Sequence, residues 1–305
     1  MSAPAGPIHH NGGVQVHLVD GTYELFRHYF ALPSHMTADG REVAALRGVA
    51  SSIVGMLADG ATHLGVATDH VVESFRNDLY DGYKTGEGMP PDLWAQFHPL
   101  EDVLTAIGVV VWPMIDYEAD DGLASAAAMA SADPAVDKVL ICTPDKDLAQ
   151  CVVGDRVVQF DRRKGTVADV EGVVAKFGVE PASIPDWLAL VGDTADGFPG
   201  LPRWGAKSAA TVLAHYRHLE AIPADPTGWE IAVRGAATLA SVLADQMDDA
   251  LLFRRLATLD RSAPTSASVD ALCWRGPTDD LDDVLGAHDL GRLAGRVREL
   301  AAQRA

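Results

Sequence analysis

KVLICTPDKD, residues 138–147, joins an apolar run to a pair of aspartates. The run is typical of a buried β-strand, and Asp145 and Asp147 follow directly at its carboxyl end. The same pattern occurs in VQVHLVD (residues 14–20) and THLGVATD (residues 62–69), which both end in an aspartate. Because ligands bind beyond the carboxyl ends of parallel strands, this repetition predicts that distant acids meet at one edge of a sheet.

Segments with the apolar spacing of helices separate these strands. Residues 41–60 and 91–108 both show this spacing, and each ends at a glycine. GVVVWP (residues 108–113) and RVVQF (residues 156–160) add two further short apolar strands. Strands that alternate with helices indicate an α/β fold, with a mainly parallel sheet flanked by helices.

The domain organisation follows from where these patterns begin and end. The first residues are small, polar and rich in Gly and Pro, so we expect a disordered tail over residues 1–13. The strand pattern fades after about residue 165, and the remainder is mostly helical in character. We therefore predict an α/β core over residues 14–180 and a helical region over residues 181–305.

The charge balance is strongly acidic. The chain of 305 residues has a formal net charge of −19, which argues against a nucleic-acid partner if the acids are spread over the surface. If the acids are instead concentrated as metal ligands, the net charge does not argue against a nucleic-acid partner. The chain shows no paired cysteine spacing and no apolar run near the roughly 18 residues that span a bilayer, so we expect a cytoplasmic protein with no membrane partner.

Nine carboxylates lie near predicted strand ends or in the stretch GDTADG. They are Asp20, Asp69, Glu118, Asp120, Asp121, Asp145, Asp147, Asp193 and Asp196. One acid at a strand end is usually a helix cap, but repetition at four junctions favours a shared site. Close carboxylates repel one another unless a cation neutralises them, and Mg²⁺ or Mn²⁺ suits carboxylate oxygens. Two such ions about 4 Å apart can promote displacement at a phosphodiester.

Five segments, in order, resemble the bacterial and phage 5′-nuclease family of flap endonucleases and 5′→3′ exonucleases, also found as the N-terminal domain of bacterial DNA polymerase I. They are VDGTYELFR, FRNDLYDGYK, YEADD, TPDKD and GDTADGFPGLPRWGAKSA. The resemblance implies a PIN-like core with an arch at about residues 75–100 and a helix-three-turn-helix motif for duplex binding at about residues 186–215. It also implies metal-dependent hydrolysis of DNA at 5′ ends, flaps or junctions in replication or repair, with RNA primers in RNA–DNA hybrids as further substrates.

The resemblance divides the acids between two or more Mg²⁺ or Mn²⁺ ions. The ligands implied for the first ion are Asp20, Asp69, Glu118, Asp120 and Asp121. Those implied for the second are Asp145, Asp147, Asp193 and Asp196.

Four other side chains receive roles from the same resemblance. Lys84 would contact the scissile phosphate, and Tyr83 would stack on a terminal base. Arg27 and Arg76 would contact phosphates near the cut. The structural alternatives are core packing for Tyr83, a solvated lysine for Lys84 and surface ion pairs for the arginines. Glu87 stands near the arginine usual in the family, which argues against a strongly cationic arch.

The segment from Gly200 to Ser208 is the implied contact to the duplex backbone. Gly205 would begin a helix that faces a phosphate, with Lys207 and Ser208 in the first turn. The family also holds a monovalent cation, commonly K⁺, at this element. Arg203 stands where the family has a glycine, so a positive φ there would strain the arginine.

Two other classes of function remain open at this stage. A DNA-junction-binding protein without strong catalysis fits the net charge and Glu87, although nine carboxylates favour an enzyme. A PIN-type ribonuclease fits the acid-edged sheet, although such proteins are shorter and usually lack the Gly/Pro–Lys–Ser element.

Overall fold

The computed structural model describes residues 13–304 and divides them into two compact units, which we call the sheet unit and the helical unit. The sheet unit comprises residues 13–74, 86–143 and 260–304. The helical unit comprises residues 75–85 and 144–259. The disordered tail expected over residues 1–13 lies outside the described residues, except for Gly13.

Four parallel strands form the centre of the sheet unit, in the order β3-β2-β1-β4. They are β1 (Val14–Asp20), β2 (His63–Asp69), β3 (Val110–Met114) and β4 (Val136–Cys142). Leu18 of β1 lies opposite Gly65 of β2 and Ile141 of β4. Leu18 and Ile141 are fully buried, as expected for a parallel sheet that is covered on both faces. The predicted strands are therefore present.

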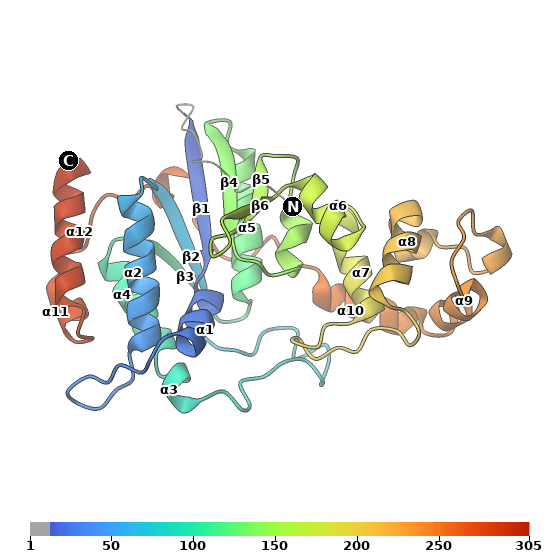
Figure 1. Cartoon of the computed structure of the whole chain (residues 1–305), viewed down its shortest axis with the longest axis horizontal. Helices are drawn as coiled ribbons and strands as arrows, with labels where there is room; N and C mark the ends of the chain where they lie inside the picture. The colour runs from blue at the N-terminus through green and yellow to red at the C-terminus, as the bar shows by residue number, and fades with distance from the viewer. Residues whose placement is uncertain (1–12, 305) are drawn as a thin grey trace. The chain divides into compact units, whose positions relative to one another are not determined.

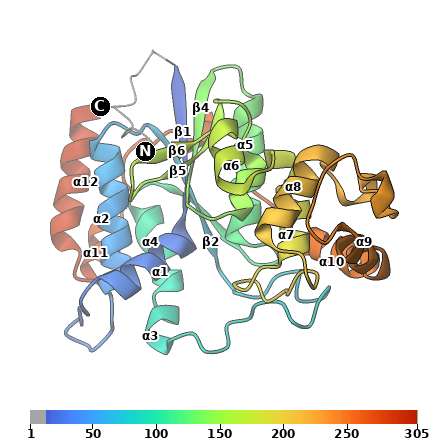
Figure 2. The same cartoon turned by 45° about the vertical axis from the view of Figure 1, so that its right-hand side comes forward.

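Helices cover both faces of these strands. They are α1 (Gly21–Ala31), α2 (Ala44–Ala58), α3 (Pro91–Trp94), α4 (Phe97–Ala106) and α5 (Ala119–Ala132). Figures 1 and 2 show α2 and α4 on one side of the strands and α5 on the other. Right-handed crossovers explain this arrangement, because the chain moves outward from β1 to β3 and then reverses to reach β4. The helix predicted over residues 91–108 is interrupted between α3 and α4.

Residues 260–304 belong to the sheet unit, which differs from the expectation of one helical region over residues 181–305. This segment contains η5 (Asp270–Leu272), α11 (Leu281–Gly286) and α12 (Gly291–Arg304). Helix α12 packs on α2, and α11 packs on α4. The indole nitrogen of Trp274 donates to the carbonyl oxygen of Ile107 at 2.9 Å. Apolar positions far along the chain thus complete the core around the sheet.

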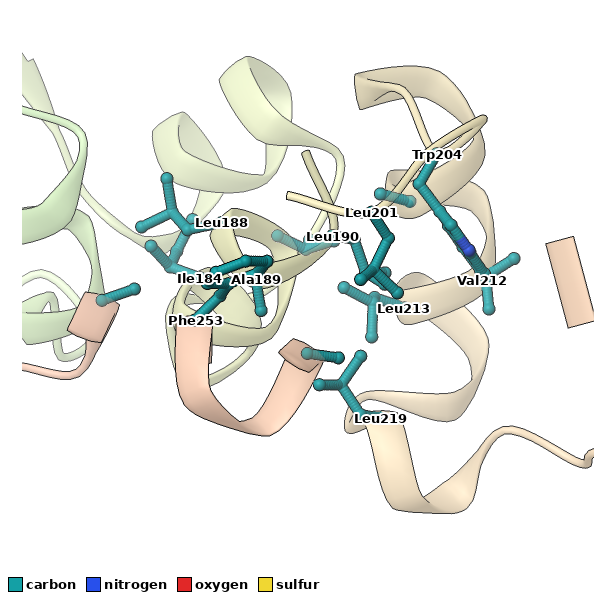
Figure 3. Packing of buried hydrophobic residues seen from close by; sticks show 14 of the residues in the cluster. Ile184, Leu188, Ala189, Leu190, Leu201, Trp204, Val212, Leu213, Leu219 and Phe253 are labelled. Carbon is teal, nitrogen blue, oxygen red and sulfur yellow. The ribbon is translucent and has the colours of Figure 1, made fainter. Parts of the chain in front are cut away.

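The helical unit is built mainly from helices around one apolar core. Its elements are η1 (Asp147–Cys151), β5 (Val157–Asp161), β6 (Thr166–Ala168), α6 (Val170–Phe177), η2 (Pro181–Ser183), α7 (Ile184–Val191), α8 (Ala206–Tyr216), η3 (Leu219–Ala221), η4 (Pro226–Gly228), α9 (Ala236–Asp245) and α10 (Met247–Ala257). Figure 3 shows Leu188 of α7 and Phe253 of α10 in this core. The Phe253 ring also stacks on Phe198, with centroids 5.7 Å apart.

Within the part of the chain that is described, no helix combines the length and apolar character needed to cross a membrane.

Residues 75–85 contain no helix or strand but are held tightly within the helical unit. The amide nitrogen of Lys84 donates to the carbonyl oxygen of Asp196 at 3.0 Å. Gly197 has a φ of +89°, and a Cβ atom there would lie 2.2 Å from the carbonyl oxygen of Gly82. Only glycine allows the two backbones to approach this closely.

We expect Gly197→Ala to lower the melting temperature by about 5 °C, because the added methyl group combines a steric clash with a left-handed backbone conformation. Thermal unfolding followed by circular dichroism measures this effect. Gly228→Ala is the matched control, because a Cβ atom there meets only Pro223 at an ordinary 3.7 Å. Equal melting temperatures for the two variants would contradict the close approach.

Candidate active site

Three buried carboxylates meet inside the helical unit. Asp147, Asp193 and Asp196 each present an oxygen, and these oxygens all lie within 4.8 Å of one another. Asp147 begins η1, whereas Asp193 and Asp196 lie in the turn that follows α7. We call these residues the acid triad. All three are among the ligands implied for the second metal ion.

Backbone hydrogen bonds fix the turn that carries two members of the triad. Asp193 and Phe198 exchange bonds, from the Asp193 nitrogen to the Phe198 oxygen at 2.8 Å and in the reverse direction at 3.1 Å. The Asp193 Oδ1 atom also accepts from the amide of Ala195 at 3.0 Å. This closure sets the direction of the two carboxylates before any ligand arrives.

The electrostatics of the triad are unfavourable for three charged acids. Burial raises the pKa of Asp147 well above its usual value, and the charges of Asp145, Asp196 and Asp193 raise this pKa further. Its Oδ1 atom is buried and accepts no hydrogen bond from any described residue. A buried carboxylate oxygen without a donor, beside two other carboxylates, fits a hard divalent cation such as Mg²⁺ or Mn²⁺.

Two lysines lie against the triad. Lys84 Nζ is 3.0 Å from Asp196 Oδ1, and Lys146 Nζ forms a close ion pair with Asp193 Oδ2. Lys146 Nζ is also 3.7 Å from Asp147 Oδ1, and the surrounding carboxylates raise the pKa of this lysine. Lys84 was expected here from the sequence, whereas Lys146 was not. Its position between the two aspartates of TPDKD was the available signal.

Asp145 differs from the triad in exposure and in its partners. Its side chain is partly exposed, and its Oδ1 atom accepts from the amide of Asp147 at 3.0 Å. Its carbonyl oxygen accepts from the side-chain amide of Gln159 at 2.5 Å. Asp145 therefore orients the start of η1 and places a fourth negative charge beside the triad.

In the sheet unit, Asp20 and Asp69 lie at strand ends, and their carboxylates accept hydrogen bonds from other segments of the unit. Asp20 accepts from the amide of Tyr23 at 2.8 Å and from the hydroxyl of Thr143 at 3.1 Å. Asp69 Oδ1 accepts from the amide of Ala119 at 2.7 Å. The bond from Tyr23 makes Asp20 the N-cap of α1, whereas Asp69 binds the first residue of α5, 50 positions along the chain. Both carboxylates are thereby oriented at the carboxyl edge of the sheet.

The start of α5 carries the remaining three acids, Glu118, Asp120 and Asp121. Asp121 is fully buried, and its two oxygens accept from the amides of Glu118 at 3.1 Å and Asp260 at 2.8 Å. Glu118 accepts from the hydroxyl of Ser74 at 2.7 Å.

The expected first metal site is less closely assembled than the triad. Among the described residues of the sheet unit, no three of its five predicted ligands offer oxygens within 4.8 Å of one another. Their grouping around one ion therefore stays a prediction.

A buried polar group that the sequence analysis missed lies at the end of β2. Glu101 accepts from the hydroxyl of Thr68 at 2.8 Å, and its other oxygen lies 2.8 Å from His70 Nδ1. The rings of His70 and His98 stack with centroids 4.1 Å apart. This network fixes the backbone on both sides of Asp69. The sequence pattern does not predict this network, because its residues come from separate segments of the chain.

Arg76 and Tyr83, for which roles at the DNA were expected, are both buried. Arg76 is only 1% exposed, and its guanidinium group donates to the carbonyl oxygens of Leu256 at 2.8 Å and Thr258 at 3.1 Å. A contact between this guanidinium group and phosphate stays a prediction. Tyr83 is 4% exposed and belongs to the core of the helical unit, which matches the core-packing alternative. Its stacking on a terminal base stays a prediction.

Arg27 is partly exposed and pairs with the buried carboxylate of Glu24, at 2.5 Å. This ion pair matches the structural alternative considered for Arg27. A contact between its guanidinium group and phosphate stays a prediction.

The turn from Gly200 to Ser208 begins helix α8 as expected. Gly205 precedes the helix, and its amide donates to the Ser208 hydroxyl at 3.1 Å. Lys207 is exposed in the first turn. Gly200 has a φ of +68°, and Arg203 has a φ of +70°, so the arginine does adopt the strained conformation at the glycine position. A left-handed conformation costs a residue with a side chain about 1–2 kcal/mol.

Two family descriptions match the chain. "5'-3' exonuclease, N-terminal resolvase-like domain" matches residues 15–178, and "5'-3' exonuclease, C-terminal SAM fold" matches residues 179–280. The chain therefore belongs to the 5′-3′ exonuclease family.

Named relatives agree with this assignment. A 5′-3′ exonuclease of Aquifex aeolicus is 34% identical over 209 residues, which cover 68% of this chain and 71% of the relative. DNA polymerase I of Pseudomonas aeruginosa is 33% identical over 266 residues, which cover 84% of this chain. The chain spans only 28% of the length of that polymerase.

Solved structures show the same fold at lower sequence identity. Bacteriophage T5 5′-exonuclease with bound zinc has a TM-score of 0.61 at 18% identity, covering 94% of this chain and 99% of the phage protein. The catalytic core of Rad2 in complex with a DNA substrate has a TM-score of 0.63 at 15% identity, covering 97% of this chain and 96% of the Rad2 chain.

We expect Arg76→Met to lower the melting temperature by about 5 °C or more, because it removes buried hydrogen bonds to two carbonyl groups at the end of α10. Arg163→Met is the control, because Arg163 is an exposed arginine of the same unit. An unchanged melting temperature together with weaker DNA binding would instead support the phosphate contact.

The raised pKa of Asp147 predicts how stability depends on pH without metal. A carboxylate whose pKa is higher in the folded state stabilises the fold below its unfolded pKa, about 3.9, and this contribution is lost as the pH rises through the folded value. In EDTA, Asp147→Asn is therefore expected to melt at a higher temperature than the wild type at pH 7. This difference should shrink as the pH falls toward 4.

Thermal unfolding between pH 4 and pH 8 tests this expectation. Asp225→Asn is the control, because Asp225 is an exposed acid whose pKa is lowered by hydrogen bonds from Thr227. A wild-type protein that melts above Asp147→Asn at pH 7 in EDTA would show that the triad is not under charge repulsion.

Proposed function

We propose that this protein is a divalent-metal-dependent 5′-nuclease that hydrolyses DNA phosphodiesters at or near 5′ ends and flaps. The acid triad carries the proposal, because three buried carboxylates within 4.8 Å of one another are suited to Mg²⁺ or Mn²⁺. The Aquifex relative, named a 5′-3′ exonuclease, supports it.

A bound Mg²⁺ or Mn²⁺ would supply the positive charge that lets an anionic phosphodiester approach the carboxylates. Asp147, Asp193 and Asp196 would hold this ion, with the charge of Asp145 beside them. The acids at the strand ends of the sheet unit would hold another. The metal in the T5 structure supports the use of a divalent ion.

Lys84 is the side chain best placed to meet the substrate. Its ammonium group contacts Asp196, and its side chain is 29% exposed, so Lys84 lies beside the triad with access to solvent. A positive charge at this position would stabilise the negative charge that develops on phosphate during hydrolysis.

The turn from Gly200 to Ser208 would hold the DNA duplex through its backbone. Arg203, Lys207 and the first turn of α8 offer positive charge and backbone N–H groups without reading the base sequence. We include K⁺ at this turn in the proposal, on the strength of the motif alone.

The biological setting extends the same proposal. The polymerase relatives support a role in replication or repair, and the Rad2 complex supports a DNA substrate. RNA primers in RNA–DNA hybrids, a cytoplasmic location and work on nucleoid DNA are further parts of the proposal.

A panel of 5′-labelled flap, nicked and single-stranded DNAs tests the function, with Mg²⁺ or Mn²⁺ added and product lengths mapped. We expect cleavage near the 5′ end, near-complete loss in Asp145→Asn and a kcat at least about 100-fold lower in Lys84→Met. Asp225→Asn, which alters an exposed carboxylate outside the triad, should keep full activity.

Intact substrates with both metals would reject the nuclease. Binding of the flap in EDTA without cleavage after metal addition would favour the junction-binding alternative. Preference for a matched RNA flap would favour the ribonuclease alternative.

A further inference from the structure

We propose that Lys146 is an internal counter-ion that neutralises the acid triad in the metal-free protein and competes with the divalent cation for Asp193. Lys146 would thereby lower the affinity for metal and stabilise the protein without it. This inference rests on the proposed metal site and adds a residue that sets the strength of that site.

The position of the Lys146 ammonium group carries the inference. Its nitrogen makes a close ion pair with Asp193 Oδ2 and lies 3.7 Å from Asp147 Oδ1. It therefore faces two of the three triad members at once. Both partners are deeply buried, with side chains 3% and 7% exposed. Removal of a charge-balancing group from such buried carboxylates is strongly unfavourable.

The competition follows from the atoms involved. Asp193 Oδ2 is occupied by an ammonium group, and a cation bound by Asp193 and Asp147 must displace that group or stay beside it. Two positive charges a few ångströms apart repel each other strongly in a site that is shielded from water. In either case the charge of Lys146 opposes the binding of the metal ion, and breaking its ion pair with Asp193 removes this opposition.

The side chain of Lys146 can move away from Asp193 as well as pair with it. Its side chain is 31% exposed, so the ammonium group has a route to solvent from its position over the triad. Lys146 immediately precedes η1 and comes directly before Asp147 in the chain. The ammonium group is carried on a flexible four-carbon stem, so it can move without a change in the backbone that positions Asp147.

Lys84 contacts a different member of the triad, so the two lysines have different roles. It contacts Asp196 at 3.0 Å, and its own amide is bound to the Asp196 carbonyl oxygen. This second link keeps Lys84 at the edge of the triad whether or not its ammonium group is paired. Lys146 is the residue whose charge lies over the other two acids.

Calorimetric titration of the EDTA-stripped full chain with Mn²⁺, without DNA, tests the inference. We expect Lys146→Met to bind Mn²⁺ roughly tenfold more tightly than the wild type, because the competing charge is gone. Lys164→Met is the matched control. Lys164 is an exposed lysine of the same unit that pairs with Asp161 at 3.1 Å, so its Mn²⁺ affinity should equal that of the wild type.

Thermal unfolding gives a second readout that is independent of activity. In EDTA at pH 7, Lys146→Met should melt below the wild type, and saturating Mn²⁺ should raise its melting temperature by more than that of the wild type. If Lys146→Met does not fold in EDTA, Lys146→Gln provides the same loss of charge with an amide that can still donate to Asp193.

Equal or weaker Mn²⁺ binding by the charge-removing variants, with normal binding by the wild type, would overturn the role of Lys146 but leave the metal site intact. A wild-type protein that binds no Mn²⁺ would overturn both the metal site and this inference.

Discussion

The repulsion between three buried carboxylates is the main physical constraint on the structure of the helical unit. Asp147, Asp193 and Asp196 stay within 4.8 Å of one another although burial raises the pKa of Asp147 and favours its neutral form. The surrounding structure supplies what opposes this repulsion. Backbone bonds close the Asp193 turn, and two lysines bring positive charge. These contacts hold the three carboxylates together, and the repulsion that remains between them favours binding of a cation.

The same constraint explains why residues far apart in sequence are joined. Lys84 reaches Asp196 only because the chain around Gly82 lies directly against Gly197. Arg76 secures the same segment to the end of α10 from inside the core. A buried arginine and a glycine at positive φ therefore act together to place one lysine beside one carboxylate. Gly197 directly follows Asp196 in the chain, and its amide donates to the carbonyl oxygen of Asp193 at 2.9 Å.

Much of the fold and part of the candidate site could be predicted from the sequence. The strand ending in TPDKD and the acids of GDTADG led to the triad because buried strands and acidic turns leave strong local patterns. The burial of Arg76 and Tyr83 left no such pattern, since it depends on α10, which lies far along the chain. The three-residue strand β6 was missed because its side chains are mostly exposed and show no apolar alternation. The place of α11 and α12 in the sheet unit also depends on long-range packing that periodicity does not report.

The interleaving of the two units along the chain has a consequence for synthesis of the protein. The sheet unit takes its strands from the first half of the sequence but its covering helices α11 and α12 from residues beyond 260. The apolar sides of α2 and α4 therefore stay uncovered by α11 and α12 until residues beyond 260 have left the ribosome. Folding that proceeds from the N-terminus can complete the helical unit first, even though the sheet strands emerge earlier. The two family matches meet at residues 178 and 179, which both lie inside the helical unit. The boundary between the two matches is therefore not a boundary between two units that fold separately during synthesis.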